Sequence, residues 1–165
     1  MKKVLICDAN ILIDYAQANK RIIHLAAQNL YEIRVPLPVW AEVNDLTDQE
    51  AKALGLKLAE PTLDQIIEVG QMYGGQLSEE DNTCFVMARD EKAICATNEK
   101  TLRKKCQKNN IEIMWGLEWM IELCQIKKLS VDSAEKVARQ IANNNHTITD
   151  DIIVRFLVQI KKTKK

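Results

Sequence analysis

The sequence predicts an α/β fold of three layers, in which helices cover both faces of a mainly parallel β-sheet. Short, continuous apolar runs such as residues 4–7 are typical of strands that are buried on both faces of a parallel sheet. Longer stretches with apolar residues at helical spacing separate these runs, and such strand–helix alternation favours parallel pairing. Beyond Gly116 only helical patterns remain. We therefore expect a sheet domain followed by a helical extension.

The strand-like runs are short, and each is followed by a helical segment. Pro36 and Pro38 end the second run, and Gly74-Gly75 interrupts the chain before a helix for which Ser78 is the expected N-cap. The predicted strands are residues 4–7, 32–37, 56–58, 93–96 and 111–114. The predicted helices of this part are residues 10–30 (as one helix or two), 39–46, a segment from Thr62 to about 73, the segment after Ser78, and 99–109.

Three amphipathic segments form the predicted helical end, at residues 117–127, 130–144 and 149–161. Ser130 and Thr149 are suitable N-caps for the last two, because serine and threonine hydroxyls accept hydrogen bonds from the first free amides of a helix. We expect residues 1–120 to form the main domain. Residues 121–165 are expected to pack on that same domain as a C-terminal helical extension.

The composition is that of a single globular domain. Of 165 residues, 47% are hydrophobic, which is enough for one substantial core. The formal net charge is zero, so any contact with nucleic acid would depend on local basic patches rather than on the overall charge. The candidate patches are Arg103-Lys104-Lys105, Lys127-Lys128 and the tail Lys161-Lys162-Thr163-Lys164-Lys165; each is equally well explained as a solvated surface.

Cysteine and histidine usage argues against disulfides and against a zinc site. The five cysteines are widely spaced with no C-x-x-C pair, and there are only two histidines. We expect reduced, buried cysteines. The apolar segment after Met1 is too short for a signal peptide, and no run is long enough to span a membrane. The expectation is a soluble, cytoplasmic protein with no membrane partner.

Two acidic residues directly follow predicted strands. Asp8 comes after residues 4–7, and Glu99 comes soon after residues 93–96. Ligands of parallel sheets gather at the carboxyl ends of strands, so both positions favour a functional role. Each acid also precedes a predicted helix, and capping of that helix is an alternative explanation.

Two further acids lie on helix faces that otherwise look buried. Glu42 falls in the stripe of Val39, Val43 and Leu46, and Asp81 shares a face with Cys84, Phe85 and Ala88. An unpaired charge in such a place is costly. The alternatives are a salt bridge for Glu42 and a favourable interaction with the helix dipole for Asp81, although the dipole does not explain why the buried side is used.

If these four acids converge, their repulsion calls for a cation. Oxygen-only ligands suit Mg²⁺ or Mn²⁺. Such an ion polarises a phosphodiester and activates water for in-line attack. The ligand set thus predicts metal-dependent phosphodiester hydrolysis.

The same residues resemble the motifs of PIN-domain nucleases. The segment Val-Leu-Ile-Cys-Asp8-Ala-Asn10 resembles the opening of that family, and Glu42 in Val-Trp-Ala-Glu-Val matches its second acid. Leu-Ser-Glu-Glu-Asp81-Asn is similar to its third-acid motif, and Thr97-Asn-Glu99-Lys-Thr-Leu-Arg is similar to the family's T-x-D-x-x-L-R segment. Gly116 stands where the family often has a glycine after its last strand. The likeness covers about residues 2–120.

The resemblance implies specific roles for these residues. Asp8, Glu42 and Asp81 would bind the principal Mg²⁺ or Mn²⁺, and Glu99 would support it or a second ion. Asn10 and Thr97 would have supporting roles, as hydrogen-bonding residues that orient the carboxylates or the attacking water. Asn98 would be an alternative metal ligand. Glu99 departs from the family's usual aspartate, which bears mainly on the second ion. Asp14 is interpreted as a surface helix acid.

The resemblance also implies a biological setting. The helical end is similar to the extension of a prokaryotic, VapC-toxin-like subgroup of the PIN family. It predicts an endoribonuclease acting on RNA as the toxin of a toxin–antitoxin pair, with a cognate antitoxin and a second copy of the chain as partners. Trp115 and Trp119 are candidates for a dimer interface, although core packing is the commoner role of tryptophan.

Other functions remain open at this stage. A phosphatase of the haloacid-dehalogenase kind needs a second aspartate where Asn10 stands, and a receiver-like signalling domain needs its acceptor on a middle strand and a lysine after the last one. The alternatives closer to the main prediction are a PIN-fold binding or scaffold protein with weakened catalysis, and a housekeeping RNA-processing nuclease.

Overall fold

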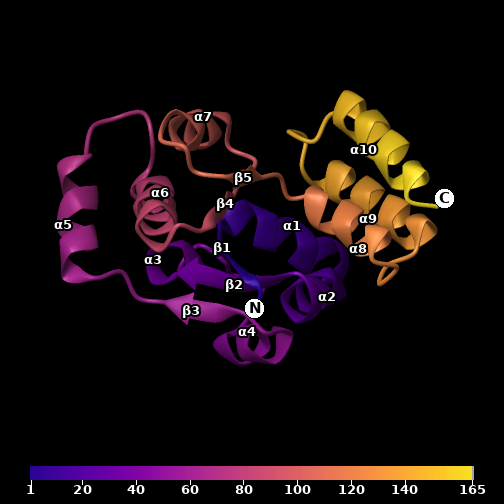
Figure 1. Ribbon diagram of the computed structural model, residues 1–165, viewed down its shortest axis with the longest axis horizontal. Helices are drawn as coiled ribbons and strands as arrows, with labels where there is room; N and C mark the ends of the chain where they lie inside the picture. Colours follow the sequence, from indigo (N-terminus) through magenta and orange to yellow (C-terminus); the bar gives the residue numbers. More distant parts are fainter. Residues whose placement is uncertain (165) are drawn as a thin grey trace.

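A five-stranded, entirely parallel sheet forms the centre of the computed structural model, which describes residues 1–164 (Figure 1). The strand order is β3-β2-β1-β4-β5. The predicted α/β fold is confirmed, and so is the parallel pairing. The strands are β1 (Lys3–Cys7), β2 (Tyr31–Pro36), β3 (Lys57–Ala59), β4 (Ile94–Ala96) and β5 (Ile113–Met114).

Helices cover the sheet on both faces. The chain runs from β1 through β2 to β3 on one side of β1, and then crosses to β4 and β5 on the other side. Right-handed crossovers in opposite directions place their helices on opposite faces, which produces three layers. The helices between the strands are α1 (Ala9–Asn19), α2 (Arg21–Asn29), α3 (Leu37–Trp40), α4 (Asp48–Leu54), α5 (Leu63–Gln71), α6 (Glu79–Glu91) and α7 (Lys100–Lys108).

The strand order reverses between β1 and β4, which pair with each other in the middle of the sheet. Connections leave these two strands in opposite directions, so a crevice is expected at their carboxyl ends. Asp8 directly follows β1, and Thr97 directly follows β4. The amide of Asp8 donates to the carbonyl of Ala96 at 3.0 Å, so the pairing of the two strands fixes the backbone on which the Asp8 side chain stands.

The predicted helix over residues 39–46 is wrong. Helix α3 ends at Trp40, a turn follows, and a separate helix α4 begins after Thr47. The reason is local: Thr47 and Glu50 form a reciprocal capping box, with bonds of 2.9 and 3.1 Å between backbone amides and side chains. This capping box fixes the N-terminus of α4, which the apolar periodicity alone did not indicate.

The helical end consists of α8 (Glu118–Gln125), α9 (Val131–Asn144) and α10 (Asp150–Lys162). Helix α9 packs against α1, and α10 packs against α8 and α9 (Figure 1). The Ser130 hydroxyl caps α9 as predicted, whereas Thr149 occupies the N-cap position of α10 without a side-chain bond. The expected boundary after residue 120 falls inside α8, so that helix belongs to both parts.

Core packing joins α8 to the sheet domain. The fully buried Trp119 stacks on Tyr15 of α1, with ring centroids 5.4 Å apart. The Tyr15 hydroxyl donates to the carbonyl of Gly116 at 2.5 Å. Trp119 therefore has the core role, while Trp115 is only partly buried.

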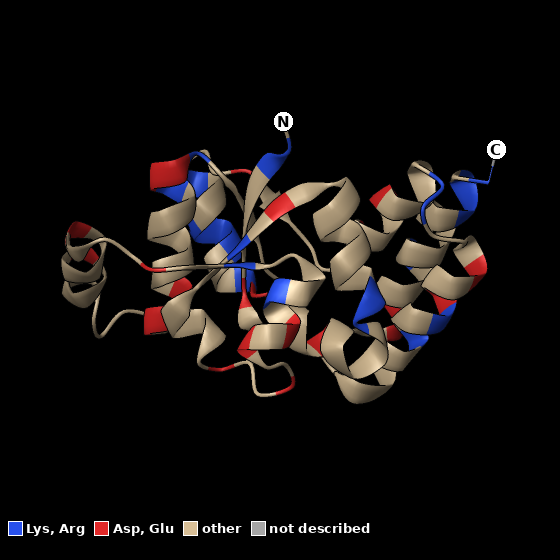
Figure 2. Cartoon of the chain, turned by 90° about the horizontal axis from the view of Figure 1, so that it is seen from below, with Lys and Arg blue, Asp and Glu red and all other residues tan. Residues whose placement is uncertain are grey.

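All five cysteines are buried and free. Basic and acidic positions are interspersed along the chain (Figure 2), in keeping with its neutral net charge. Within residues 1–164, no helix combines the length and the apolar character needed to cross a membrane. The final residue of the basic tail, Lys165, lies outside the described residues.

Candidate carboxylate site

Asp8 lies at the carboxyl end of β1, next to β4, and is only 4% exposed. Its Oδ1 accepts from the Ala9 amide at 2.7 Å, and its Oδ2 accepts from the Thr97 hydroxyl at 2.9 Å. Asp8 is thus the N-cap of α1, as the alternative explanation expected. Capping uses one lone pair of one oxygen, which leaves the carboxylate able to accept further hydrogen bonds or to bind a cation.

Electrostatically, Asp8 is in an unfavourable place for a negative charge. Its pKa is raised from the ordinary 3.8 to about 6: burial is the largest cause, the charges of Asp81 and Glu42 add to it, and the bonds from Thr97 and Ala9 oppose it. Among residues 1–164, no Lys, Arg or His nitrogen lies within 4.0 Å of this carboxylate. The fold therefore buries an acid among other acids without a protein cation.

Asp81 comes from the first turn of α6 and is partly buried. Its backbone amide donates to the Ser78 hydroxyl at 3.1 Å, so the predicted cap fixes where this turn begins. Burial raises the pKa of Asp81; the nearby charges of Glu99 and Glu80 also raise it, while Ser78 lowers it. The apolar neighbours expected on its face, Cys84 among them, are buried.

The surroundings of Glu42 differ from those that the sequence predicts. The predicted buried helix face does not exist there: Glu42 lies in the turn after α3 and is exposed. The pKa of Glu42 is nevertheless raised, first by the desolvation that remains there and then by the charges of Glu80 and Asp81, so Glu42 is electrostatically coupled to these acids. The turn brings Glu42 to the cluster by topology rather than by helical periodicity.

Glu80 was not predicted as part of this cluster. It is partly buried, and its charge raises the pKa of both Glu42 and Asp81. Only its position next to Asp81 in the first turn of α6 signals this role in the sequence.

Glu99 is exposed and caps α7, which is the alternative that its position left open. Its carboxylate accepts from the Thr101 amide at 3.4 Å, and its own amide donates to the Thr97 hydroxyl at 3.0 Å. Thr97 consequently links Glu99 to Asp8 through one buried hydroxyl. Glu99 is connected to the other acids in two ways: its charge raises the pKa of Asp81, and its amide donates to the Thr97 hydroxyl that also binds Asp8.

The two asparagines predicted as supporting residues line the same pocket, but their environments differ. The Asn98 amide oxygen accepts from the Gly116 amide at 3.0 Å and thereby positions the loop after β5. Asn98 thus has a structural role of its own, and its role as an alternative ligand stays a prediction. Asn10 is exposed and lines a pocket of about 400 Å³ together with Asn98 and Glu99.

The interpretation of Asp14 as a surface acid is wrong. Asp14 is 8% exposed, and both of its carboxylate oxygens accept from the Asn145 side-chain amide, at 3.1 and 3.2 Å. The pKa of Asp14 is raised to about 6, because burial outweighs the lowering effect of the bond from Asn145. The covering segment comes from the far end of the chain, so local sequence gives no sign of this burial.

The donor chemistry of Asp8, Glu42, Asp81 and Glu99 fits a hard divalent cation. All four are carboxylates, and the mutual repulsion that raises the pKa of Asp8 would be relieved by a cation. Among residues 1–164, however, no three acidic, histidine or cysteine side chains are already arranged to hold an ion. Glu42 and Glu99 are exposed, and Glu99 would have to release its bond to the Thr101 amide in order to turn toward such an ion.

Replacing Thr97 with valine tests the link between Asp8 and Glu99. The variant leaves Asp8 Oδ2 without its donor and the Glu99 amide without its acceptor. We expect a loss of about 1–3 kcal/mol in the free energy of unfolding at pH 7, measured with urea. The pKa of Asp8 should rise further, since the Thr97 bond lowers it. An unchanged Asp8 titration, followed by NMR of its carboxyl carbon, would contradict this account.

Comparisons of the chain with protein-family models, with curated proteins and with solved structures find no match.

Proposed function

We propose that this protein is a metal-dependent ribonuclease that hydrolyses RNA phosphodiester bonds. One observation carries the proposal: the buried carboxylate of Asp8, at the point where the strand order reverses, has other carboxylates as charged neighbours and no cation among the described residues. A fold tolerates such a cluster at a cost in stability, and sites of this kind are commonly functional. The PIN-like motifs support the same conclusion.

Asp8, Glu42 and Asp81 would hold Mg²⁺ or Mn²⁺, with Glu99 as a further ligand or as support for a second ion. When bound, the ion supplies polarisation of the phosphodiester and activation of water. The residues of the chain have separate tasks. The Thr97 hydroxyl orients Asp8 through a 2.9 Å bond, and the Ser78 cap fixes the turn that carries Asp81.

The test is cleavage of an end-labelled, single-stranded RNA pool by the purified full chain. We expect cleavage with Mg²⁺ or Mn²⁺ and its loss on addition of EDTA, with recovery when excess Mn²⁺ is restored. Cleavage that persists in EDTA would identify a contaminating or metal-independent activity. The absence of cleavage with both ions, for a protein that is folded by circular dichroism, would reject the proposal.

A binding or scaffold protein is the second candidate. The capping role of Glu99 and its exposure favour it, because they leave this acid with a structural function of its own. Such a protein would bind RNA without cutting it in the same assay.

The setting that we propose is the cytoplasm of a prokaryote, with the chain as the toxin of a toxin–antitoxin pair. A cognate antitoxin and a homodimer remain predictions from the resemblance. Growth arrest on expression favours a toxin, whereas normal growth together with cleavage in vitro favours a housekeeping nuclease.

A further inference from the structure

Helix α7 concentrates positive charge in a chain whose net charge is zero. Five of its nine residues are basic, namely Lys100, Arg103, Lys104, Lys105 and Lys108. Among residues 1–164, the ammonium groups of Lys104, Lys105 and Lys108 have no carboxylate within 4.0 Å. This positive charge is therefore available to an external anion.

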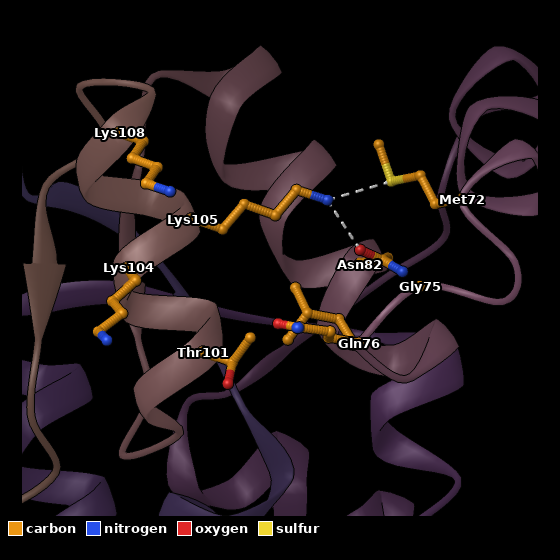
Figure 3. A pocket seen from close by; sticks show the side chains of 9 residues that line it. Met72, Gly75, Gln76, Asn82, Thr101, Lys104, Lys105 and Lys108 are labelled. Carbon is orange, nitrogen blue, oxygen red and sulfur yellow. Dashed lines mark hydrogen bonds between the residues drawn. The ribbon is translucent and has the colours of Figure 1, made fainter.

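These three lysines line one concave pocket of about 390 Å³ (Figure 3). Lys105 reaches across it: its Nζ donates to Asn82 Oδ1 at 3.0 Å and lies 4.4 Å from the centre of the Phe85 ring. The pocket wall thus holds Lys105 in place. Lys104 and Lys108 are exposed and lie one helical turn apart.

The lining groups suit a phosphate. Like charges one turn apart on a helix repel each other, and a bound anion removes that repulsion. Besides the lysines, Thr101 and Gln76 line the pocket, and their side chains carry neutral donors. A phosphate has several oxygens around one centre, so it can accept from lysine, hydroxyl and amide donors on different walls at once.

The pocket is adjacent to the carboxylate site. Asn82, on one wall, directly follows Asp81 on α6, and Thr101, on the other wall, is two residues beyond Glu99. A polymer with regularly spaced phosphates can therefore present one phosphodiester to the carboxylates and a neighbouring phosphate to the lysines.

We propose that the pocket formed by Lys104, Lys105 and Lys108 binds a backbone phosphate of single-stranded RNA next to the bond that is cut. This inference rests on the proposed function. It adds a phosphate-binding site on α7 to the carboxylate site. It also explains how a protein with no net charge binds a polyanion beside a group of acids.

The experiment measures binding of a fluorescent single-stranded RNA to the full wild-type chain in EDTA, across a series of salt concentrations. The test variant is Lys104→Gln/Lys108→Gln, which changes two exposed side chains and keeps Lys105, whose contacts support the fold. The matched control is Lys52→Gln/Lys136→Gln, at exposed positions of α4 and α9 outside the candidate basic patches, which removes the same charge elsewhere.

We expect the test variant to bind RNA roughly 10-fold more weakly at low salt. The slope of log K against log salt should decrease by about 0.7, since the pocket holds one phosphate and each phosphate contact contributes about 0.7 for single strands. The control should keep the wild-type slope. In the cleavage assay, the test variant should raise KM with little change in kcat, because it removes binding remote from the reacting atoms.

Three results would overturn the inference: equal losses in the test variant and the control, an unchanged salt slope, or lysine-dependent binding of an acidic peptide or inorganic phosphate with none of RNA. Because binding is measured in EDTA, the two proposals fail separately. Lysine-dependent binding without cleavage rejects only the nuclease. Cleavage whose KM is the same in the test variant rejects only the pocket.

Discussion

Replacement of Asp8 with asparagine is expected to reduce metal-dependent RNA cleavage at least about 100-fold, since loss of groups that merely orient metal ligands already costs up to that much. The same variant should make the metal-free protein more stable by about 1–3 kcal/mol at pH 7.5, since a pKa difference of one unit corresponds to about 1.4 kcal/mol. Both effects have one origin: Asp8 is a buried carboxylate with a pKa of about 6, and its burial and its acidic neighbours disfavour its charged form. Asparagine keeps an oxygen for the Ala9 amide, and the Thr97 hydroxyl can accept from its amide group.

The pH dependence of stability provides an independent measurement of the same cost. The pKa of Asp8 is about 6 in the folded protein against an ordinary 3.8, so between these values the folded state binds more protons than the unfolded state. Stability must then fall as pH rises through this window, and the penalty is complete above it. In wild type without metal, we expect the free energy of unfolding to increase from pH 7.5 to pH 5. The Asp8→Asn variant should show a smaller increase.

Asp14→Asn is the matched control for Asp8→Asn. Asp14 is also buried, also has a pKa of about 6 and is held by Asn145 rather than by the carboxylate cluster. Its replacement should stabilise the protein in the same pH window and leave cleavage at the wild-type level. If Asp8→Asn cleaves as fast as Asp14→Asn, Asp8 does not belong to a catalytic site. If Asp8→Asn is less stable than wild type at pH 7.5, the carboxylate is not under electrostatic strain.

Much of the fold could be predicted because its signals are local. The run before Asp8 is buried on both faces of the sheet, and continuous apolar sequence is the mark of such a strand. Ser78 and Ser130 begin their helices through side-chain bonds to the amide three residues later. The error at residues 39–46 arose because Val43 and Leu46 are buried in the irregular segment between α3 and α4, at positions whose spacing matches that of a helix.

The composition of the candidate site could be predicted only in part. Asp8 follows a strand and Asp81 lies on a buried face, and both features are visible in the sequence. The neighbourhood of Glu42 with Glu80, the burial of Asp14 under Asn145 and the bond between Lys105 and Asn82 all join segments that are distant in sequence. Contacts of this kind depend on how helices pack, and a single sequence has no periodicity that records them.

Replacement of Trp119 with alanine is expected to cost about 3–5 kcal/mol in the free energy of unfolding, as is usual for a large buried aromatic residue. Trp119 is fully buried in α8 and stacks on Tyr15, whose hydroxyl holds the Gly116 carbonyl. The cavity would lie where the helical end meets the sheet domain. A loss of this size is a large part of the about 5–15 kcal/mol that stabilises a typical domain. Urea unfolding should show one cooperative transition at a lower midpoint, because both parts share this contact.

Trp119→Phe separates packing from hydrogen bonding at the same position. The indole nitrogen of Trp119 is buried without a hydrogen-bond partner among the described residues, so phenylalanine removes an unsatisfied donor while it keeps most of the ring. We expect its cost to be well below that of alanine, since an unsatisfied buried donor carries a penalty of about 1–3 kcal/mol. Tyr73→Ala, at a position that is 95% exposed, should leave stability unchanged. Two separate transitions in wild type, with only the second shifted by Trp119→Ala, would mean that the helical end folds independently of the sheet.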